Sequence, residues 1–589
     1  MKYMQRSSLT PALVVCLTAI PAGFIGLLIL QYGVDVPYMD QWDIAPFFER
    51  LSHGSLTLRD LFAQQNEFRQ FFPYLIFLAV GRLTRWNVKY EMLVILLLAC
   101  LVSLNVYRLS ETTLGGSRRR KLLALFIVNL LIFSPVQHEN WLFGIQVVYF
   151  MPVACLTTCL LVAYSALRAR TRFLICMCLS TISTFSSANG MLCWALALPV
   201  LARAKSWDEP AGRKRLIAAW ITGWALNAAL YFYDYQKPAH HPSLSAALVH
   251  PVKAVIFFLS VLGAPLGFSQ VYVAPVVGTA LIILFSLAGL YLLRFFSDEL
   301  VARRMIGWVM LGSYSVITAA MITVGRFGFG PGQSVISRYT TFTVYLIVAL
   351  VHLIPIIIDD SSRRDRFMVA RSLLVRLVPS MVAILAGLHL LFSAIALRQV
   401  IGWRQRLLQA KACLLFIDLF PEGCAAHSLY IDQRSLRDRA VALDRLGFLR
   451  PGLIKSSSVE DLEAAGGQPP SSYGSFEALV STGDGMYVAS GWALLPDRGE
   501  PADAVLLAYD DSQNSATVFA LAEVEPVAGL LTKVFKGAAR SALRTRWQRS
   551  LAPGELPPGR PLKVTAWAFD AETGKAFRLD GAHVIQRPD

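Results

Sequence analysis

Residues 272–293 read YVAPVVGTALIILFSLAGLYLL, a long run without a charged side chain. A helix of this length crosses the hydrocarbon layer of a bilayer, which is about 30 Å thick. Similar runs recur along the 589-residue chain, in which the mean hydropathy is +0.50 and only 16% of residues are charged. Soluble domains carry about 25% charged residues. The sequence therefore predicts a polytopic α-helical membrane protein.

About eleven transmembrane (TM) helices are predicted from the apolar runs. These runs are residues 11–30, 90–108, 121–137, 149–167, 173–186, 188–202, 216–233, 272–293, 305–325, 339–358 and 373–397. Lys and Arg gather in the loops on one side, as at 118–121 and 203–215. The positive-inside rule then places the N-terminus in the cytoplasm and the C-terminal tail on the outer face. This asymmetry accounts for the net charge of +16 better than nucleic-acid binding does.

Two shorter apolar segments, 71–84 and 254–268, do not fit this count. Pro73 and Pro265 interrupt them, so they are interpreted as interfacial or re-entrant segments packed on protein. If both crossed, the chain would have thirteen spans. The apolar run that ends at Leu30 is too long for a signal peptide and predicts a retained first helix.

The chain changes character after Arg398. Residues 1–400 form the predicted membrane domain, and 401–475 an outer helical region followed by a Ser-, Gly- and Pro-rich linker. From residue 476 to 589, alternating apolar runs separated by turn signals predict a small β-sandwich. Cys413 and Cys424 fall on the outer side, where an oxidising compartment permits a disulfide; their pairing stays open.

The first outer loop carries two polar stretches, PYMDQWD at 37–43 and QNEFR at 65–69. Carboxylates beside a bilayer can hold a divalent metal against a phosphate, or accept a proton from an incoming hydroxyl. For Asp40 this functional interpretation is favoured. For Asp43 the favoured interpretation is structural, as the N-cap of a helix that starts at Ile44.

Further polar groups are predicted on the same side of the membrane. HENWLFGIQ, residues 138–146, lies between two spans, and SSANG, residues 186–190, is a polar break between two short ones. A single histidine at the edge of a membrane, such as His138, is more often a hydrogen-bonded structural residue than a ligand. Arg326 and Arg338 depart from the positive-inside pattern, and a guanidinium binds phosphate in a bidentate fork. The alternative for both is snorkelling to lipid headgroups.

With these residues assembled, the chain resembles the bacterial members of the GT-C superfamily of integral membrane glycosyltransferases. The resemblance covers roughly residues 1–400 and rests on PYMDQWD, QNEFR, HENWLFGIQ and the SRY of 337–339. It implies that the sugar arrives on a polyprenyl phosphate and that an outer carboxylate acts as base or metal-associated residue. That role falls on Asp40, where the divalent cation, Mg²⁺ or Mn²⁺, would also sit.

The resemblance places Arg338 and Arg326 at the donor phosphate, and the polar stretches supply the other candidates. Glu67 and Glu139 are the other candidate catalytic carboxylates; Arg326, Arg338 and Arg69 are candidates for the donor phosphate; Asp43, Asn66, His138 and Asn140 complete the polar set. The chain departs from the family at Phe68, where an NEHR-like stretch would have a His.

The predicted function is sugar transfer to a cell-envelope glycan, lipid or protein acceptor on the outer face of a bacterial inner membrane, with the C-terminal domain periplasmic. No GxGxxG or DxD element lies on the predicted cytoplasmic side, so a nucleotide-sugar donor is not expected. An alternative is a non-catalytic lipid-linked glycan flippase or polysaccharide-assembly factor, which would place ionisable residues inside the spans. A lipid-linked oligosaccharide polymerase also stays open. The sugar and the acceptor are not identified by the sequence.

Overall fold

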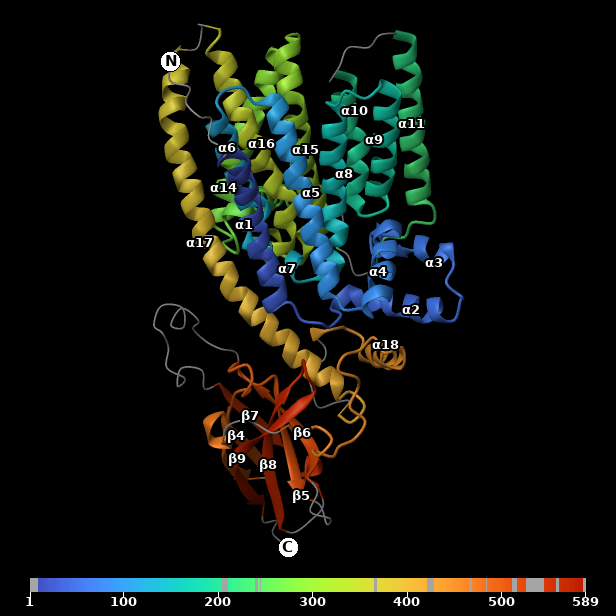
Figure 1. Cartoon of the computed structure of the whole chain (residues 1–589), viewed down its shortest axis with the longest axis vertical. Coiled ribbons are helices and arrows are strands. Elements are labelled where there is room, and N and C mark those ends of the chain that lie inside the picture. The colour runs from blue at the N-terminus through green and yellow to red at the C-terminus, as the bar shows by residue number, and fades with distance from the viewer. Residues whose placement is uncertain are drawn as a thin grey trace. The chain divides into compact units, whose positions relative to one another are not determined.

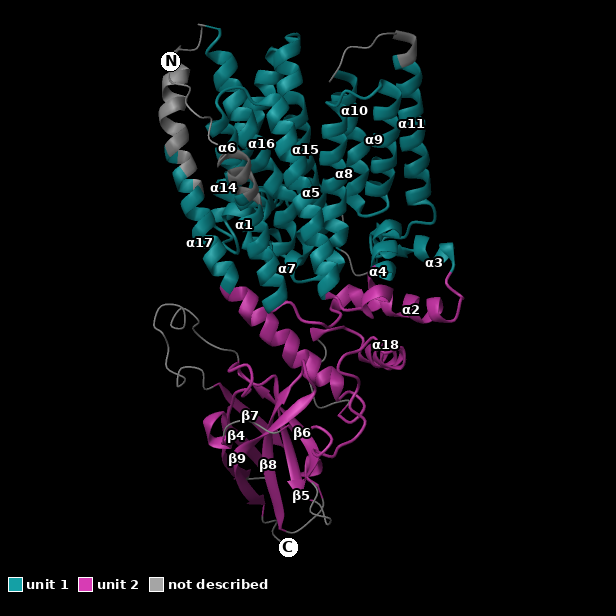
Figure 2. Ribbon diagram, in the orientation of Figure 1, with its two compact units in different colours: residues 1–31, 57–79, 89–397 teal, residues 32–56, 80–88, 398–589 magenta. Residues whose placement is uncertain are grey.

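The computed structural model describes most of the chain as two compact units, which are treated one at a time (Figure 2). Unit 1 comprises residues 1–31, 57–79 and 89–397, and unit 2 comprises residues 32–56, 80–88 and 398–589. The described residues are 9–203, 210–238, 242–243, 245–364, 368–420, 428–464, 469–483, 485–510, 516–525, 545–557 and 561–585.

Unit 1 is a bundle of long helices, many of which run side by side (Figure 1). Its helices are α1 (Leu9–Tyr32), α3 (Leu58–Phe62), α4 (Phe71–Thr84), α5 (Lys89–Thr113), α6 (Arg118–Ile132), α7 (His138–Trp141), α8 (Val147–Ala163), α9 (Ala169–Thr184), α10 (Leu192–Arg203), α11 (Pro210–Phe232), α12 (Ala246–Val249), α13 (Pro251–Gly263), α14 (Val273–Arg294), α15 (Glu299–Arg326), α16 (Ser337–Ser361) and α17 (Met368–Leu415). The last parts of α1, α4 and α17 belong to unit 2.

Each of the eleven predicted runs coincides with a helix, because an apolar segment in lipid must satisfy its backbone hydrogen bonds within itself. Among the described residues, seven helices are long and apolar enough to cross a membrane. They are 89–113, 118–141, 144–163, 273–294, 299–329, 337–361 and 386–415. The chain is thus a membrane-associated helical protein, and the count of eleven crossings is not confirmed.

The two segments that did not fit the count are both short apolar helices. Pro73 lies in the first turn of α4, where a missing N–H costs nothing, so the helix continues to Thr84. The chain leaves α13 at Gly263 and continues through Pro265 in the 3-10 turn η5 (Ala264–Leu266). Gly263 also permits close packing, since a Cβ there would lie 1.9 Å from the carbonyl oxygen of Ala274.

Short elements join the ends of the long helices. They are the strands β1 (Gln64–Gln65) and β2 (Phe68–Arg69) and the 3-10 turns η2 (Pro135–Gln137), η3 (Gly144–Gln146), η4 (Ala188–Met191), η6 (Phe327–Phe329) and η7 (Pro331–Val335). At the centre of the bundle, α8 packs on α5, α9 and α10, and α15 packs on α10 and α16. These contacts bring the turns before α8, before α10 and after α15 into one region of the unit.

Unit 2 contains two short amphipathic helices and a β domain. Helix α2 (Ala45–Ser52) follows the 3-10 turn η1 (Met39–Ile44), and it packs on α18 (Gln433–Arg445). Phe48 of α2 lies against Trp86 and Phe448, with ring centroids 4.7 and 5.1 Å away. The outer helical region predicted after residue 400 thus includes α18, whose apolar face packs on protein.

The β domain is a closed barrel of seven strands. They are β3 (Gly474–Gly483), β4 (Met486–Ala493), β5 (Ala504–Asp510), β6 (Ala516–Val524), β7 (Arg546–Leu551), β8 (Leu562–Asp570) and β9 (Lys575–Ile585), in the order β3-β4-β7-β6-β5-β8-β9. Neighbouring strands are antiparallel, except that Ser475 pairs with Asp580 in parallel and closes the barrel. Short 3-10 turns lie at Pro470–Ser472 and Pro553–Glu555. Phe476, Trp492 and Trp547 are among the residues of its core.

The β domain departs from the sequence prediction in two respects. A sandwich is not confirmed, because the β3–β9 pairing joins what would have been two open edges. Part of the predicted linker is also structured: Val518 N donates to Ser457 O at 2.7 Å, and Ala464 N donates to Ala576 O at 2.9 Å. These backbone hydrogen bonds attach residues 457–464 to the barrel.

Cys413 differs from the other cysteines of the described residues. Cys413, near the end of α17, is in a disulfide, and its expected partner Cys424 lies outside the described residues. The seven cysteines of the apolar segments are free thiols.

Candidate functional site

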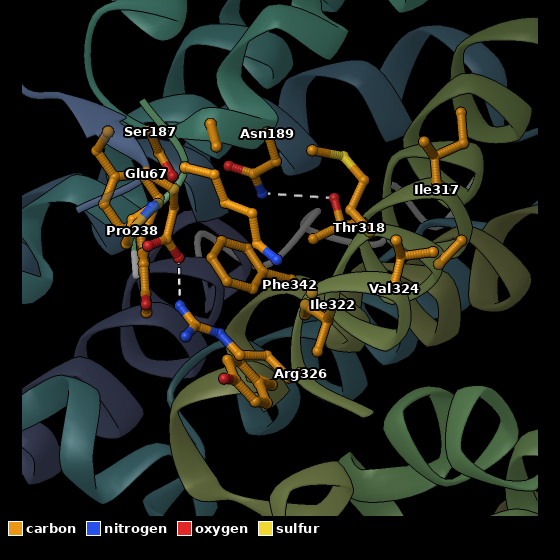
Figure 3. A pocket seen from close by; sticks show the side chains of 18 of the residues that line it. Glu67, Ser187, Asn189, Pro238, Ile317, Thr318, Ile322, Val324, Arg326 and Phe342 are labelled. Carbon is orange, nitrogen blue, oxygen red and sulfur yellow. Dashed lines mark hydrogen bonds and ion pairs between the residues drawn. The ribbon is translucent and has the colours of Figure 1, made fainter. Parts of the chain in front are cut away.

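Unit 1 contains a cavity of about 580 Å³ lined by segments that are far apart in the chain (Figure 3). They are the β1–β2 turn, the start of α8, the break between α9 and α10, residues 235–238, the second half of α15 and the start of α16. Four of the six were singled out from the sequence, as QNEFR, SSANG, Arg326 and SRY. The packing of α8, α10, α15 and α16 brings them together.

Glu67 is presented to the cavity by a tight hairpin. Gln65 pairs with Phe68 across β1 and β2, so Asn66 and Glu67 form the two-residue turn. Asn66 has a φ of +50°, a left-handed conformation that Asn tolerates better than most residues. The Tyr231 hydroxyl donates to Glu67 O at 2.6 Å. Asn66, predicted as a polar site residue, thus shapes the turn that positions Glu67.

Arg69 anchors the same hairpin. Its side chain is 6% exposed, and its Nε donates to Tyr231 O at 2.7 Å and its Nη1 to Phe62 O at 2.8 Å. Its Nη2 donates to Tyr233 O. With all three nitrogens engaged by backbone carbonyls, Arg69 holds the hairpin against the end of α11. It is not among the residues that line the cavity, so this geometry does not support its predicted role at a phosphate.

Arg326, the last residue of α15, forms an ion pair with Glu67 in the cavity (Figure 3). The two side chains are 22% and 20% exposed, so the pair is partly shielded from solvent. Lys237 adds a second cation to the lining, and its Nζ donates to Pro242 O at 2.7 Å. Burial, and next the negative charge of Glu67, raise the pKa of Tyr235, whose hydroxyl therefore stays protonated as a donor.

The opposite side of the cavity is apolar. Ile317, Met321 and Val324 line it from one face of α15, at the spacing of successive helical turns. They are 37%, 39% and 44% exposed. Phe342 of α16 lies nearby on the same cavity (Figure 3). The site therefore combines two cations and a carboxylate with an accessible hydrocarbon wall.

Glu139 and Arg338 form a second ion pair in unit 1. Arg338 Nε lies 3.6 Å from Glu139 Oε2, and neither residue is among the cavity lining. Asn140 ties this loop to α16: its Nδ2 donates to Arg338 O at 2.9 Å and to Thr341 Oγ1 at 2.6 Å. His138 is 4% exposed, with its Nδ1 3.3 Å from Ser337 Oγ. The HENWLFGIQ loop thus fastens α7 to the start of α16.

Asp40 and Asp43 belong to unit 2 and are described apart from this cavity. Asp40 is exposed in the first turn of η1, and its assignment as base stays a prediction. Asp43 is not the predicted N-cap, since the cap position of α2 is Ile44. Instead Asp43 Oδ1 accepts hydrogen bonds from Tyr430 Oη and Arg439 Nη1, both at 2.7 Å. A sequence pattern could not reveal these partners, which are nearly 400 residues away.

Three further residues of the site had no clear signal in the sequence. Tyr149 and Phe342 lie within apolar runs, where aromatic residues are common. Lys237 lies in a loop, where a charged residue is equally common. No three His, Cys, Asp or Glu side chains of the described residues converge as a metal site would require. The divalent cation expected at Asp40 therefore stays a prediction without a ligand set.

Comparisons of the chain with models of protein families, with curated proteins and with solved structures found no match. The class of protein is therefore defined by its structure alone: a membrane-associated helical bundle with a polar and apolar cavity, carrying a seven-stranded β-barrel at its C-terminal end.

Proposed function

We propose that the chain is a GT-C-type membrane glycosyltransferase that moves a sugar from a polyprenyl-phosphate donor to a glycan, lipid or protein acceptor. The observation that carries the proposal is the composition of the unit 1 cavity. Arg326 and Lys237 supply positive charge at one part of its lining, and the exposed face of α15 supplies hydrocarbon at another. A polyprenyl-phosphate sugar complements both features, because it carries an anionic phosphate and a hydrocarbon chain in one molecule.

The charged groups suit the chemistry of such a transfer. In the reaction the acceptor oxygen forms a bond to the anomeric carbon while the bond from that carbon to the phosphate oxygen breaks. Glu67 takes the proton of the acceptor hydroxyl, and the lipid phosphate leaves with the bonding electron pair. Arg326 and Lys237 stabilise the anion that departs. A guanidinium has five N–H donors, so Arg326 can contact both Glu67 and a phosphate.

The proposal includes the predicted topology. Eleven crossings with a cytoplasmic N-terminus in a bacterial inner membrane put the C-terminal barrel in the periplasm. The disulfide of Cys413 supports a periplasmic location for the C-terminal part of the chain, because disulfides persist in oxidising compartments. Glu67 replaces Asp40 as our first choice of base, since it shares a cavity with Arg326.

The test is turnover by the full-length protein in proteoliposomes. Polyprenyl-phosphate hexoses and pentoses are supplied with a membrane extract as acceptor, and release of polyprenyl phosphate is measured. Glu67→Gln keeps the volume and removes the charge, so we expect the rate to fall by roughly 10²–10⁴, the usual contribution of a general base. Asp359→Asn is the matched control, because Asp359 also forms a partly shielded ion pair with an arginine, Arg120, but does not line the cavity.

Two results would contradict the proposal. Wild-type protein that releases no polyprenyl phosphate from any donor is not this kind of transferase, and movement of the intact lipid across the membrane would then favour a flippase. A Glu67→Gln variant as active as Asp359→Asn would remove Glu67 from the mechanism.

A further inference from the structure

The break between α9 and α10 holds one side chain of the cavity in a fixed position. Gly190 N donates to Ser187 O, and Ser183 Oγ donates to Gly190 O, both at 2.8 Å. A Cβ at Gly190 would lie 1.7 Å from Ser183 O, so the turn can close only with glycine. Asn189 lies within this turn, in η4, and is 5% exposed.

The Asn189 amide is only half satisfied by the protein. Its Nδ2 donates to Tyr314 Oη at 2.9 Å. It also donates to Thr318 Oγ1 at 3.4 Å (Figure 3). Its Oδ1 is buried and has no hydrogen-bond partner among the described residues. Since Asn189 also lines the cavity, a molecule in the cavity can supply the missing partner. Buried polar groups are rarely left unpaired, so the arrangement points to a ligand.

The chemistry of this position favours a hydroxyl over a phosphate. A phosphate oxygen is an acceptor and cannot pair with the amide oxygen. The hydroxyls of Tyr314 and Thr318 can each donate or accept, so the amide could also be turned with Nδ2 toward the cavity. A ligand hydroxyl both donates and accepts, and it completes the hydrogen bonding in either orientation. The phosphate would instead be held by the cations Arg326 and Lys237.

We propose that Asn189 binds a hydroxyl of the sugar on the glycosylated lipid, as a residue that positions the sugar in the cavity. This inference rests on the function proposed above. It divides the cavity into a sugar part at the SSANG turn, a phosphate part at Arg326 and Lys237, and a hydrocarbon part along α15.

Binding by the full-length protein in nanodiscs tests this division. The probes are bare polyprenyl phosphate and a panel of polyprenyl-phosphate hexoses and pentoses. Wild type should bind at least one glycosylated lipid about five- to tenfold more tightly than the bare lipid, the usual size of one net hydrogen bond. Asn189→Leu, which has the same number and branching of side-chain heavy atoms, should lose this preference and keep its affinity for the bare lipid. Arg326→Gln should weaken binding of both kinds of lipid.

Asn227→Leu is the matched control. Asn227 is 7% exposed on α11, its Nδ2 donates to Gly223 O at 2.9 Å, and its Oδ1 also has no partner among the described residues, but it does not line the cavity. This variant should keep the preference for the glycosylated lipid. If Asn189→Leu does not fold, Asn189→Ala adds no bulk and should show the same selective loss.

The possible results separate the two proposals. Binding of neither kind of lipid by wild type contradicts the proposed function itself. Equal affinity for bare and glycosylated lipids overturns the sugar position and leaves the phosphate and hydrocarbon parts intact. The inference is also overturned if Asn189→Leu keeps the sugar preference, if it loses the bare lipid equally, or if Asn227→Leu loses the preference as well.

Discussion

The stability of the C-terminal barrel should decrease as the pH rises from about 4 to about 6, because of one buried carboxyl group. Asp503 is 4% exposed, and its Oδ2 accepts hydrogen bonds from Arg498 Nη2 and Ala571 N, both at 2.8 Å. Burial raises the pKa of Asp503 to about 6, against the lowering effect of Arg498. Asp570 also carries a negative charge nearby and raises this pKa further.

The direction of this pH dependence follows from whether the folded or the unfolded barrel binds the Asp503 proton more tightly. Asp503 keeps its proton to a higher pH in the folded barrel than in the unfolded chain, where its pKa is close to 3.8. Its favourable contribution is therefore complete below about pH 4 and is lost as the pH rises through about 6. Each pKa unit corresponds to about 1.4 kcal/mol, so the loss amounts to about 3 kcal/mol.

The assay is urea unfolding of residues 457–589, followed by circular dichroism and by tryptophan fluorescence. The fragment should show β-type circular dichroism, unfold cooperatively, and have a lower free energy of unfolding at pH 7 than at pH 4.5. Asp503→Asn keeps a hydrogen-bond acceptor and removes the titration. The difference between wild type and this variant therefore isolates Asp503 from Arg498, Asp570, Glu572 and other ionisable groups.

The reasoning is refuted if that difference is the same at both pH values. It is equally refuted if wild type gains stability relative to Asp503→Asn as the pH rises, because that would mean the ion pair with Arg498 outweighs burial. A fragment with a helical spectrum would refute the independent barrel.

Three further predictions concern the membrane part and the first outer loop. Reporter fusions at Gly116 and Ser475 should read cytoplasmic and outer, and an outer signal at Gly116 would favour thirteen spans. Asp43→Asn should lower the free energy of unfolding by about 1 kcal/mol, because it breaks a partly exposed ion pair with Arg439. Asp40→Asn should retain transfer, because Glu67 is the proposed base; a loss of transfer at normal protein level would return the role of base to Asp40.

Much of the secondary structure could be predicted from the sequence because helices and strands are encoded locally. Apolar runs without charges coincide with helices, and alternating runs after residue 476 coincide with strands. Marginal segments were harder to interpret, because proline acts differently at the start of α4 and after α13. Local pattern alone does not say where a proline falls within a helix.

The tertiary structure decided which polar residues share a site. Glu67 and Arg326 are 259 positions apart and form an ion pair, whereas Arg69, two residues from Glu67, has its guanidinium bound to backbone carbonyls. Closure of the barrel depends in the same way on one pairing, between Ser475 and Asp580. Hydrophobicity and periodicity determine each element within a short window of sequence, but partners across the fold depend on how the helices and strands pack. The sequence by itself thus determined the elements and the candidate polar groups, and packing decided which of them meet.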